Sequence, residues 1–138
     1  MTATGYEFLV ADLMTIEPVV IASDAPIEEA QRLLLEYEVS GLPVVDATGT
    51  LAGVISQTDF MHLNDPEVGT LIRHKPSGIK VGEVMSRPAV TVMLSTNLRE
   101  AARTMIDERV HRVVVIDERQ RPIGVLSAMD FVKLYAEE

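Results

Sequence analysis

Residues 27–63 read IEEAQRLLLEYEVSGLPVVDATGTLAGVISQTDFMHL, and residues 98–134 read LREAARTMIDERVHRVVVIDERQRPIGVLSAMDFVKL. Aligned without a gap, the two stretches are identical at 12 of 37 positions and begin 71 residues apart. The identical positions include Glu29/Glu100, Ala30/Ala101, Asp46/Asp117, Gly53/Gly124, Ser56/Ser127, Asp59/Asp130 and Phe60/Phe131. An internal repeat of this length indicates two copies of one fold. We expect the equivalent edges of the copies to meet in a shared cleft, and we expect function there.

The composition is that of a globular chain with an aliphatic core, because 47% of the 138 residues are apolar but only three are Phe, three are Tyr and none is Trp. A copy of about 60 residues would be marginally stable alone, so the two copies are expected to form one folding unit. No apolar run approaches the roughly 20 residues that span a bilayer, and the opening stretch MTATGYEFLVADLM lacks the pattern of a signal peptide. We therefore expect a soluble, cytoplasmic protein with no membrane partner.

Two further features of the composition exclude classes of chemistry. The absence of cysteine removes disulfides, thiolate nucleophiles and thiolate metal sites. A net charge of −9 argues against a general affinity for nucleic acid, whose phosphates would be repelled. The three histidines, His62, His74 and His111, lie too far apart in the sequence to resemble a zinc site, so no metal site is predicted.

Each copy is predicted to fold as strand, helix, strand, strand, helix. In the first copy, a short edge strand over Val19–Ile21 follows Pro18, which cannot donate to a ladder. Two β-branched runs then form a hairpin, the first run ending at Asp46 and the second at Ile55. The last helix begins at Ser56. The apolar face of the helix between the first strand and the hairpin comprises Ile27, Ala30, Leu34 and Tyr37.

The second copy repeats this order, with a first strand over Ala89–Val92 and a last helix that begins at Ser127. The apolar face of its first helix comprises Leu98, Ala101, Met105 and Ile106. The predicted fold class is α/β (α+β), with two tandem strand-helix-strand-strand-helix repeats packed about a pseudo-twofold axis. We predict a first repeat over residues 8–64, a connector over 65–80 and a second repeat over 81–138. The connector has room for a short helical turn around Val68–Arg73.

The motif Gly-x-x-Ser-x-x-Asp occurs in both copies where the last strand passes into the last helix, as Gly53, Ser56 and Asp59 in the first copy. One interpretation is that Ser and Asp cap the helix by bonding to the free amides of its first turn. Capping does not explain the glycine, because a glycine normally weakens a buried strand. A glycine is expected there if something must approach the backbone closely. A fixed carboxylate suits the two neighbouring hydroxyls of a ribose better than a phosphate, because it accepts hydrogen bonds and repels an anion.

The order of these motifs resembles the CBS domain pair, or Bateman module. The resemblance rests on Asp12–Thr15 and its counterpart Glu83–Ser86, on the apolar runs that end in Asp46 and Asp117, and on Gly-x-x-Ser-x-x-Asp followed by Phe. It covers nearly the whole chain. It implies that an adenosine-containing ligand binds in the cleft between the repeats, with the ribose on the final Asp and the adenine against the Pro-containing strand of the opposite repeat.

The resemblance implies two ligand sites with different preferences. One site comprises Gly53, Ser56, Asp59, Pro88, Ala89 and Val90. The other site comprises Ser127, Asp130, Pro18, Val19 and Val20. In the second copy, His111 and Arg112 look like the family's basic pair for phosphates, unless they form a solvated turn, whereas the first copy has Ser40 and Gly41 there. The basic pair is expected to face the ligand of the Asp59 site, so that site is predicted to take AMP, ADP or ATP. The Asp130 site, with Ser40, is predicted either to suit a neutral nucleoside portion or to stay empty.

No catalytic residue is predicted, because the repeats and the connector use almost all of the sequence. We expect a stand-alone regulatory module that binds AMP, ADP, ATP or an S-adenosyl compound, signals its occupancy to a partner protein and requires no cofactor. The resemblance further implies a homodimer assembled through the helices. Two alternatives stay open: a structural or nucleic-acid-binding dimer without a small ligand, and a nucleotide hydrolase with Asp59 or Asp130 as the base.

Overall fold

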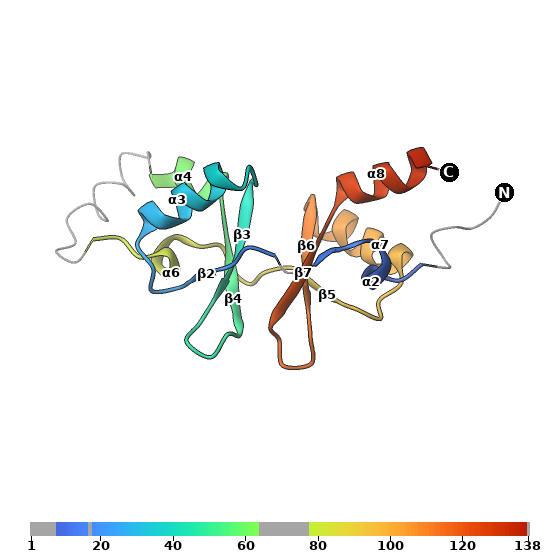
Figure 1. Ribbon diagram of the computed structural model, residues 1–138, viewed down its shortest axis with the longest axis horizontal. Coiled ribbons are helices and arrows are strands. Elements are labelled where there is room, and N and C mark those ends of the chain that lie inside the picture. The colour runs from blue at the N-terminus through green and yellow to red at the C-terminus, as the bar shows by residue number, and fades with distance from the viewer. Residues whose placement is uncertain (1–7, 17, 64–77, 138) are drawn as a thin grey trace. The chain divides into compact units, whose positions relative to one another are not determined.

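The computed structural model describes residues 8–16, 18–63 and 78–137 (Figure 1). These residues belong to two compact units. We call them the Asp59 unit, which is Val19–Ala89, and the Asp130 unit, which is Met1–Pro18 together with Val90–Glu138. The predicted helical turn around Val68–Arg73 lies outside the described residues.

The Asp59 unit contains a three-stranded sheet in the order β2-β3-β4. Strand β2 runs parallel to β3, and β3 runs antiparallel to β4. Its elements are β2 (Ile21–Ala22), α3 (Ile27–Glu36), β3 (Gly41–Val45), β4 (Leu51–Ser56), α4 (Gln57–Leu63) and α6 (Val81–Val84). Helices α3 and α4 lie beside the sheet, and the β3–β4 turn projects away from them (Figure 1). The side chains of both helices can therefore pack on the same end of the unit's core.

The Asp130 unit contains a four-stranded sheet in the order β1-β7-β6-β5, in which β5 runs parallel to β6 and the other neighbours are antiparallel. Its elements are α2 (Val10–Leu13), β1 (Thr15–Ile16), β5 (Thr91–Met93), α7 (Leu98–Glu108), β6 (Arg112–Ile116), β7 (Pro122–Ser127) and α8 (Ala128–Glu137). Within the two sequence copies the order is β2-α3-β3-β4-α4 and β5-α7-β6-β7-α8. The predicted order of elements and the predicted mixed fold class are both confirmed.

The first helix of each copy buries one face, as the spacing of its apolar residues predicts. In α7 the buried side chains are Leu98, Ala101 and Met105, at helical spacing. The prediction was wrong for Ile106, which is 66% exposed, because a helix turns 100° per residue and Ile106 follows directly after the buried Met105. It was also wrong for Tyr37, because α3 ends at Glu36 and Tyr37 lies at its exposed C-terminal cap. None of the helices in the described ranges combines the length and the apolarity that crossing a membrane requires.

The first strand of each copy begins later than the sequence predicts. The predicted strand Val19–Ile21 is found as β2 at Ile21–Ala22, and the predicted strand Ala89–Val92 is found as β5 at Thr91–Met93. Both are edge strands of their sheets, as predicted. The prolines therefore precede the strands by at least two residues, where their missing amide costs no ladder hydrogen bond.

Each core is completed by the opening segment of the other sequence copy. We use this term for residues 8–16, which belong to the Asp130 unit, and for residues 79–89, which belong to the Asp59 unit. Val10 of α2 is fully buried in the core that contains Leu126, and Val81 of α6 is fully buried in the core that contains Ile55. The sequence repeats 8–64 and 81–138 and the compact units thus divide the chain differently. Neither repeat contains its whole core.

We predict that Val10→Ala lowers the free energy of unfolding by about 2 kcal/mol, because it removes two buried methyl groups and leaves a cavity in the core. Val132→Ala on α8 is the matched control, since Val132 is 58% exposed and should change the stability by less than about 0.5 kcal/mol. Urea unfolding followed by circular dichroism measures both. Equal stability of the two variants would show that residues 8–16 do not belong to the core.

Candidate functional site

Both copies place a serine and an aspartate at the junction between the last strand and the last helix. Strand β4 ends at Ser56, whose backbone amide and hydroxyl donate to Oδ2 of Asp59 at 2.8 and 3.2 Å. Strand β7 ends at Ser127, whose amide and hydroxyl donate to Oδ2 of Asp130 at 2.8 and 3.1 Å. The carboxylates therefore hold the start of α4 and α8, as the capping interpretation predicts.

The turn before β3 or β6 is tied to the same junction. The amide of Gln57, the first residue of α4, donates to the carbonyl oxygen of Ser40 at 3.1 Å, and the amide of Ala128 donates to that of His111 at 2.8 Å. His111 and Arg112 thus belong to the unit of Asp130, whereas Ser40 belongs to the unit of Asp59. Their action on a ligand bound at the other unit's aspartate stays a prediction.

The glycines of the motif are explained by close approach of the opening segments. Val54 and Ser86 exchange two backbone hydrogen bonds of 3.0 and 2.8 Å beside Gly53. A Cβ atom on Gly53 would lie 2.6 Å from the carbonyl oxygen of Ser86 and 2.9 Å from Sδ of Met85, which is too close. The sequence correctly predicts that something approaches this backbone. That neighbour is the protein's own chain, and a contact between Gly53 and a ligand stays a prediction.

Gly124 has the same environment in the other unit. A Cβ atom there would lie 2.5 Å from Sδ of Met14 and 2.9 Å from the carbonyl oxygen of Thr15. The Met of each opening motif therefore packs where a side chain on the glycine would otherwise lie. This explains why Met and Gly recur together in both copies.

The two carboxylates differ in their third partner. Oδ1 of Asp59 accepts a hydrogen bond of 2.7 Å from the hydroxyl of Ser86. Thr15 is the counterpart of Ser86 in the other unit, but no hydrogen bond joins it to Asp130. Asp59 is 6% exposed, whereas Asp130 is half-buried. The junctions thus share their geometry but not their accessibility.

The predicted adenine-contacting residues are divided between the units. Pro88 and Ala89 lie in the unit of Asp59, and Pro18 lies in the unit of Asp130. Val90 belongs to the Asp130 unit, where its carbonyl oxygen accepts a hydrogen bond of 3.0 Å from the amide of Val114. Val19 and Val20 belong to the Asp59 unit, where Val19 packs against the core. The structure thus brings only part of each predicted set together within one unit.

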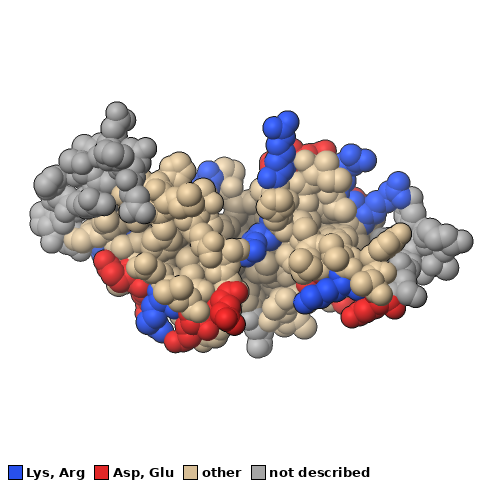
Figure 2. Space-filling view, turned by 90° about the horizontal axis from the view of Figure 1, so that it is seen from above, with Lys and Arg blue, Asp and Glu red and all other residues tan. Residues whose placement is uncertain are grey.

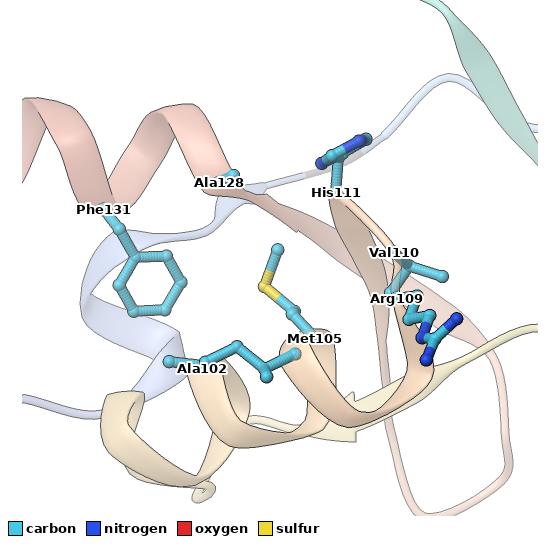
Figure 3. A pocket seen from close by; sticks show the side chains of 8 residues that line it. Ala102, Met105, Arg109, Val110, His111, Ala128 and Phe131 are labelled. Carbon is cyan, nitrogen blue, oxygen red and sulfur yellow. The ribbon is translucent and has the colours of Figure 1, made fainter.

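A hollow of about 600 Å³ lies between α7 and α8, and the sequence analysis did not predict it. Met105 of α7 and Phe131 of α8 project into it, and His111 lies at its rim (Figure 3). The lining comprises Ala102, Met105, Ile106, Arg109, Val110, His111, Ala128 and Phe131. Several counterparts in the first copy are polar, namely Gln31, Glu38, Ser40 and Gln57. Comparison of the two copies position by position would have marked this surface as different.

Asp46 and Asp117, at the ends of the apolar runs, close the hairpin turns. Oδ1 of Asp46 accepts hydrogen bonds from the hydroxyl and amide of Thr48 and from the amide of Thr50. The Thr48 hydroxyl, followed by these amides, lowers the pKa of Asp46, and the amide of Arg121 is the main cause of the lowered pKa of Asp117. Carboxylates with a lowered pKa add stability above their usual pKa, and this is lost as the pH falls through the folded-state value. These aspartates therefore serve the hairpins.

No cluster of three His, Asp or Glu side chains that could hold a metal ion occurs among the described residues. His62 and His111 are both exposed, and His74 lies outside the described residues.

Two sequence copies with the same order of elements, each with a Ser–Asp junction at the start of its last helix, define a paired-repeat protein. The family model described as "CBS domain" matches residues 10–64 and 81–137, so the chain belongs to the CBS domain family. The resemblance found in the sequence is confirmed.

The relatives include proteins of different overall architecture. The chloroplastic CBS domain-containing protein CBSX2 of Arabidopsis thaliana is 31% identical over 135 residues, which cover 83% of this chain and 57% of that protein. The 5'-AMP-activated protein kinase subunit gamma-3 of Bos taurus is 32% identical over 120 residues, which cover 83% of this chain and 22% of that protein. The chain thus spans little more than half of the first relative and about a fifth of the second.

Solved structures share the fold. The crystal structure of CBSX2 in complex with AMP matches with a TM-score of 0.82 at 31% identity, covering 94% of this chain and 97% of that chain. The CBS domain pair of protein MJ0100, in complex with 5'-methylthioadenosine and S-adenosyl-L-methionine, matches with a TM-score of 0.80 at 24% identity, covering the same shares. The second likeness concerns the fold alone.

We predict that Gly53→Ala lowers the free energy of unfolding by about 1–3 kcal/mol, because its Cβ would displace the backbone of Ser86. Gly41→Ala in β3 is the control, since its Cβ would meet no atom closer than 3.4 Å. Urea unfolding without any ligand measures both variants. Full stability of Gly53→Ala would mean that the close approach of residues 85–86 is not needed by the fold.

Proposed function

We propose that this chain is a regulatory module that binds an adenosine-containing ligand in a cleft between its two repeats. The observation that carries the proposal is the Ser–Asp junction, present twice, in which the serine that ends a strand fixes a carboxylate in the first turn of the next helix. Such a carboxylate suits a pair of ribose hydroxyls, and each charge-assisted hydrogen bond contributes on the order of 1.5–3 kcal/mol. The complex of CBSX2 with AMP supports the choice of an adenine nucleotide.

The proposed ligands are AMP, ADP, ATP or an S-adenosyl compound, without a further cofactor. Ligand that touches both repeats favours the relative orientation in which both can contact it, and this change of orientation is the proposed signal to a partner protein. An enzymatic role is not proposed, because the carboxylates that would act as bases already hold the first turns of α4 and α8. The cytoplasmic location likewise stays a proposal.

The binding of phosphate groups is proposed to depend on His111 and Arg112. Arg112 is a positive group that pairs with Ser127 in the sheet, and His111 precedes it, whereas the first copy has Ser40 and Gly41 at these positions. Within a chain of net charge −9, a phosphate needs such local positive charge. Nucleotides are therefore proposed to prefer the Asp59 site, which the basic pair of the opposite repeat would face.

We predict that His111→Ser combined with Arg112→Gly lowers the affinity for AMP at least tenfold but changes the affinity for adenosine less than about twofold. Isothermal titration calorimetry measures both ligands, and the loss for AMP should shrink as salt rises. Equal loss of both ligands would show that the pair supports the fold and does not bind phosphate. If AMP, adenosine and S-adenosylmethionine all fail to bind the unchanged protein, the proposed function fails and the alternative without a small ligand is favoured.

A homodimer assembled through the helices is also proposed. Large apolar side chains are exposed on the helices of both units, namely Leu35, Met61, Ile106, Met129, Val132 and Tyr135. Viewed from the side of these helices, the surface over each unit is mostly neither acidic nor basic (Figure 2). Exposed apolar patches of this kind mark interaction surfaces. Leu63, in contrast, packs against the core of its own unit.

We predict that the protein sediments as a dimer at micromolar concentration and that Leu35→Glu combined with Ile106→Glu converts it to a monomer, because the new charges would have to be buried in the interface. Ala47→Glu, in the exposed β3–β4 turn, is the control and should leave the dimer intact. Sedimentation equilibrium measures the mass of each. A monomeric unchanged protein would end this proposal without affecting ligand binding.

A further inference from the structure

The carboxylates of the two junctions differ in how free they are to accept a hydrogen bond from a ligand hydroxyl. Oδ1 of Asp59 is already engaged by the hydroxyl of Ser86 at 2.7 Å, while Oδ2 accepts from the amide and hydroxyl of Ser56. Oδ1 of Asp130 accepts no hydrogen bond from any residue in the described ranges, since its partner Ser127 uses Oδ2 alone. Oδ1 of Asp59 is therefore already engaged by a protein hydroxyl, whereas Oδ1 of Asp130 has no donor among the residues that the structure describes.

Burial agrees with this difference. The side chain of Asp59 is a carboxylate, yet it is only 6% exposed, whereas Asp130 is half-buried. Ser86 itself is exposed. Its backbone forms hydrogen bonds with that of Val54, and its hydroxyl donates to Asp59. Thr15 pairs with Val125 in β1 in the same way, yet its hydroxyl does not reach Asp130. The same backbone pairing thus brings a hydroxyl to the carboxylate of Asp59 but not to that of Asp130.

We infer that Ser86 determines which of the two carboxylates an uncharged nucleoside reaches, and that adenosine selects the Asp130 site. The inference rests on the proposed function. At Asp59 the Ser86 hydroxyl already occupies one acceptor position of Oδ1, and the side chain is only 6% exposed, so a ribose hydroxyl reaches Oδ1 by displacing that hydroxyl and exchanging one hydrogen bond for another. At Asp130 the same hydroxyl forms a new charge-assisted hydrogen bond. A nucleotide reaches Asp59 as well, because its phosphate adds an attraction that does not depend on this exchange.

Calorimetric titration of the 138-residue chain with adenosine tests the inference. Asp130→Asn is expected to weaken adenosine binding about tenfold, whereas Asp59→Asn is expected to change it less than about twofold. Asn keeps the size of the side chain at the buried position. In the Asp130→Asn background, Ser86→Ala is expected to restore about tenfold of affinity, because it frees Oδ1 of Asp59. Thr15→Ala in the Asp59→Asn background is the matched control and is expected to change the affinity less than about twofold.

Each other outcome overturns a defined part of the account. Equal loss of adenosine in Asp59→Asn and Asp130→Asn overturns the selection of the Asp130 site. Weaker binding after Ser86→Ala means that Ser86 is itself a ligand contact, and it overturns the role assigned to the hydroxyl. Ser86→Gly repeats the test if Ser86→Ala lacks the circular dichroism spectrum of the unchanged protein. Absence of binding of AMP, adenosine and S-adenosylmethionine to the unchanged protein overturns the proposed function and this inference together.

Discussion

In each unit the opening segment packs closely against a strand glycine, and this contact positions the core, the sheet edge and the candidate site. Residues 85–86 pack against Gly53 and residues 14–15 pack against Gly124, at distances that leave no room for a side chain. The approach lets Val54 and Ser86 pair through their backbones, and it accompanies the burial of Val81 one turn earlier. It also brings the hydroxyl of Ser86 to Asp59. Core, sheet edge and candidate site are thus fixed by one contact.

The spacing of apolar residues along the chain correctly predicted individual helices and hairpins. Helical spacing of Leu98, Ala101 and Met105 identified the buried face of α7, and the apolar runs identified both hairpins. The same reasoning failed at Tyr37 and Ile106, because periodicity marks neither the end of a helix nor the edge of its buried face. The short helices α2 and α6 were not predicted, since four residues are too few to show a period.

Long-range features could not be predicted from one copy at a time. Nothing in residues 8–16 says that they pack on strands more than a hundred residues later, so the repeats and the compact units differ. The site was predicted to the extent that Ser56, Asp59, Ser127 and Asp130 form the junctions as capping requires. The segments that approach the two glycines were not predicted, because the sequence indicates a close neighbour without identifying it. The hydrogen bond from Ser86 to Asp59 could not be predicted either, because Ser86 and its counterpart Thr15 both carry a hydroxyl and the sequence does not show which hydroxyl reaches an aspartate.

A crystal structure of the protein grown with AMP would show whether the Ser–Asp junctions bind the ribose of an adenosine-containing ligand. We predict ribose hydroxyl oxygens within hydrogen-bond distance, about 2.5–3.0 Å, of a carboxylate oxygen of Asp59 or Asp130. AMP bound with its ribose away from both carboxylates would contradict the account, even if the affinity were high. In that case the junctions would be helix caps alone.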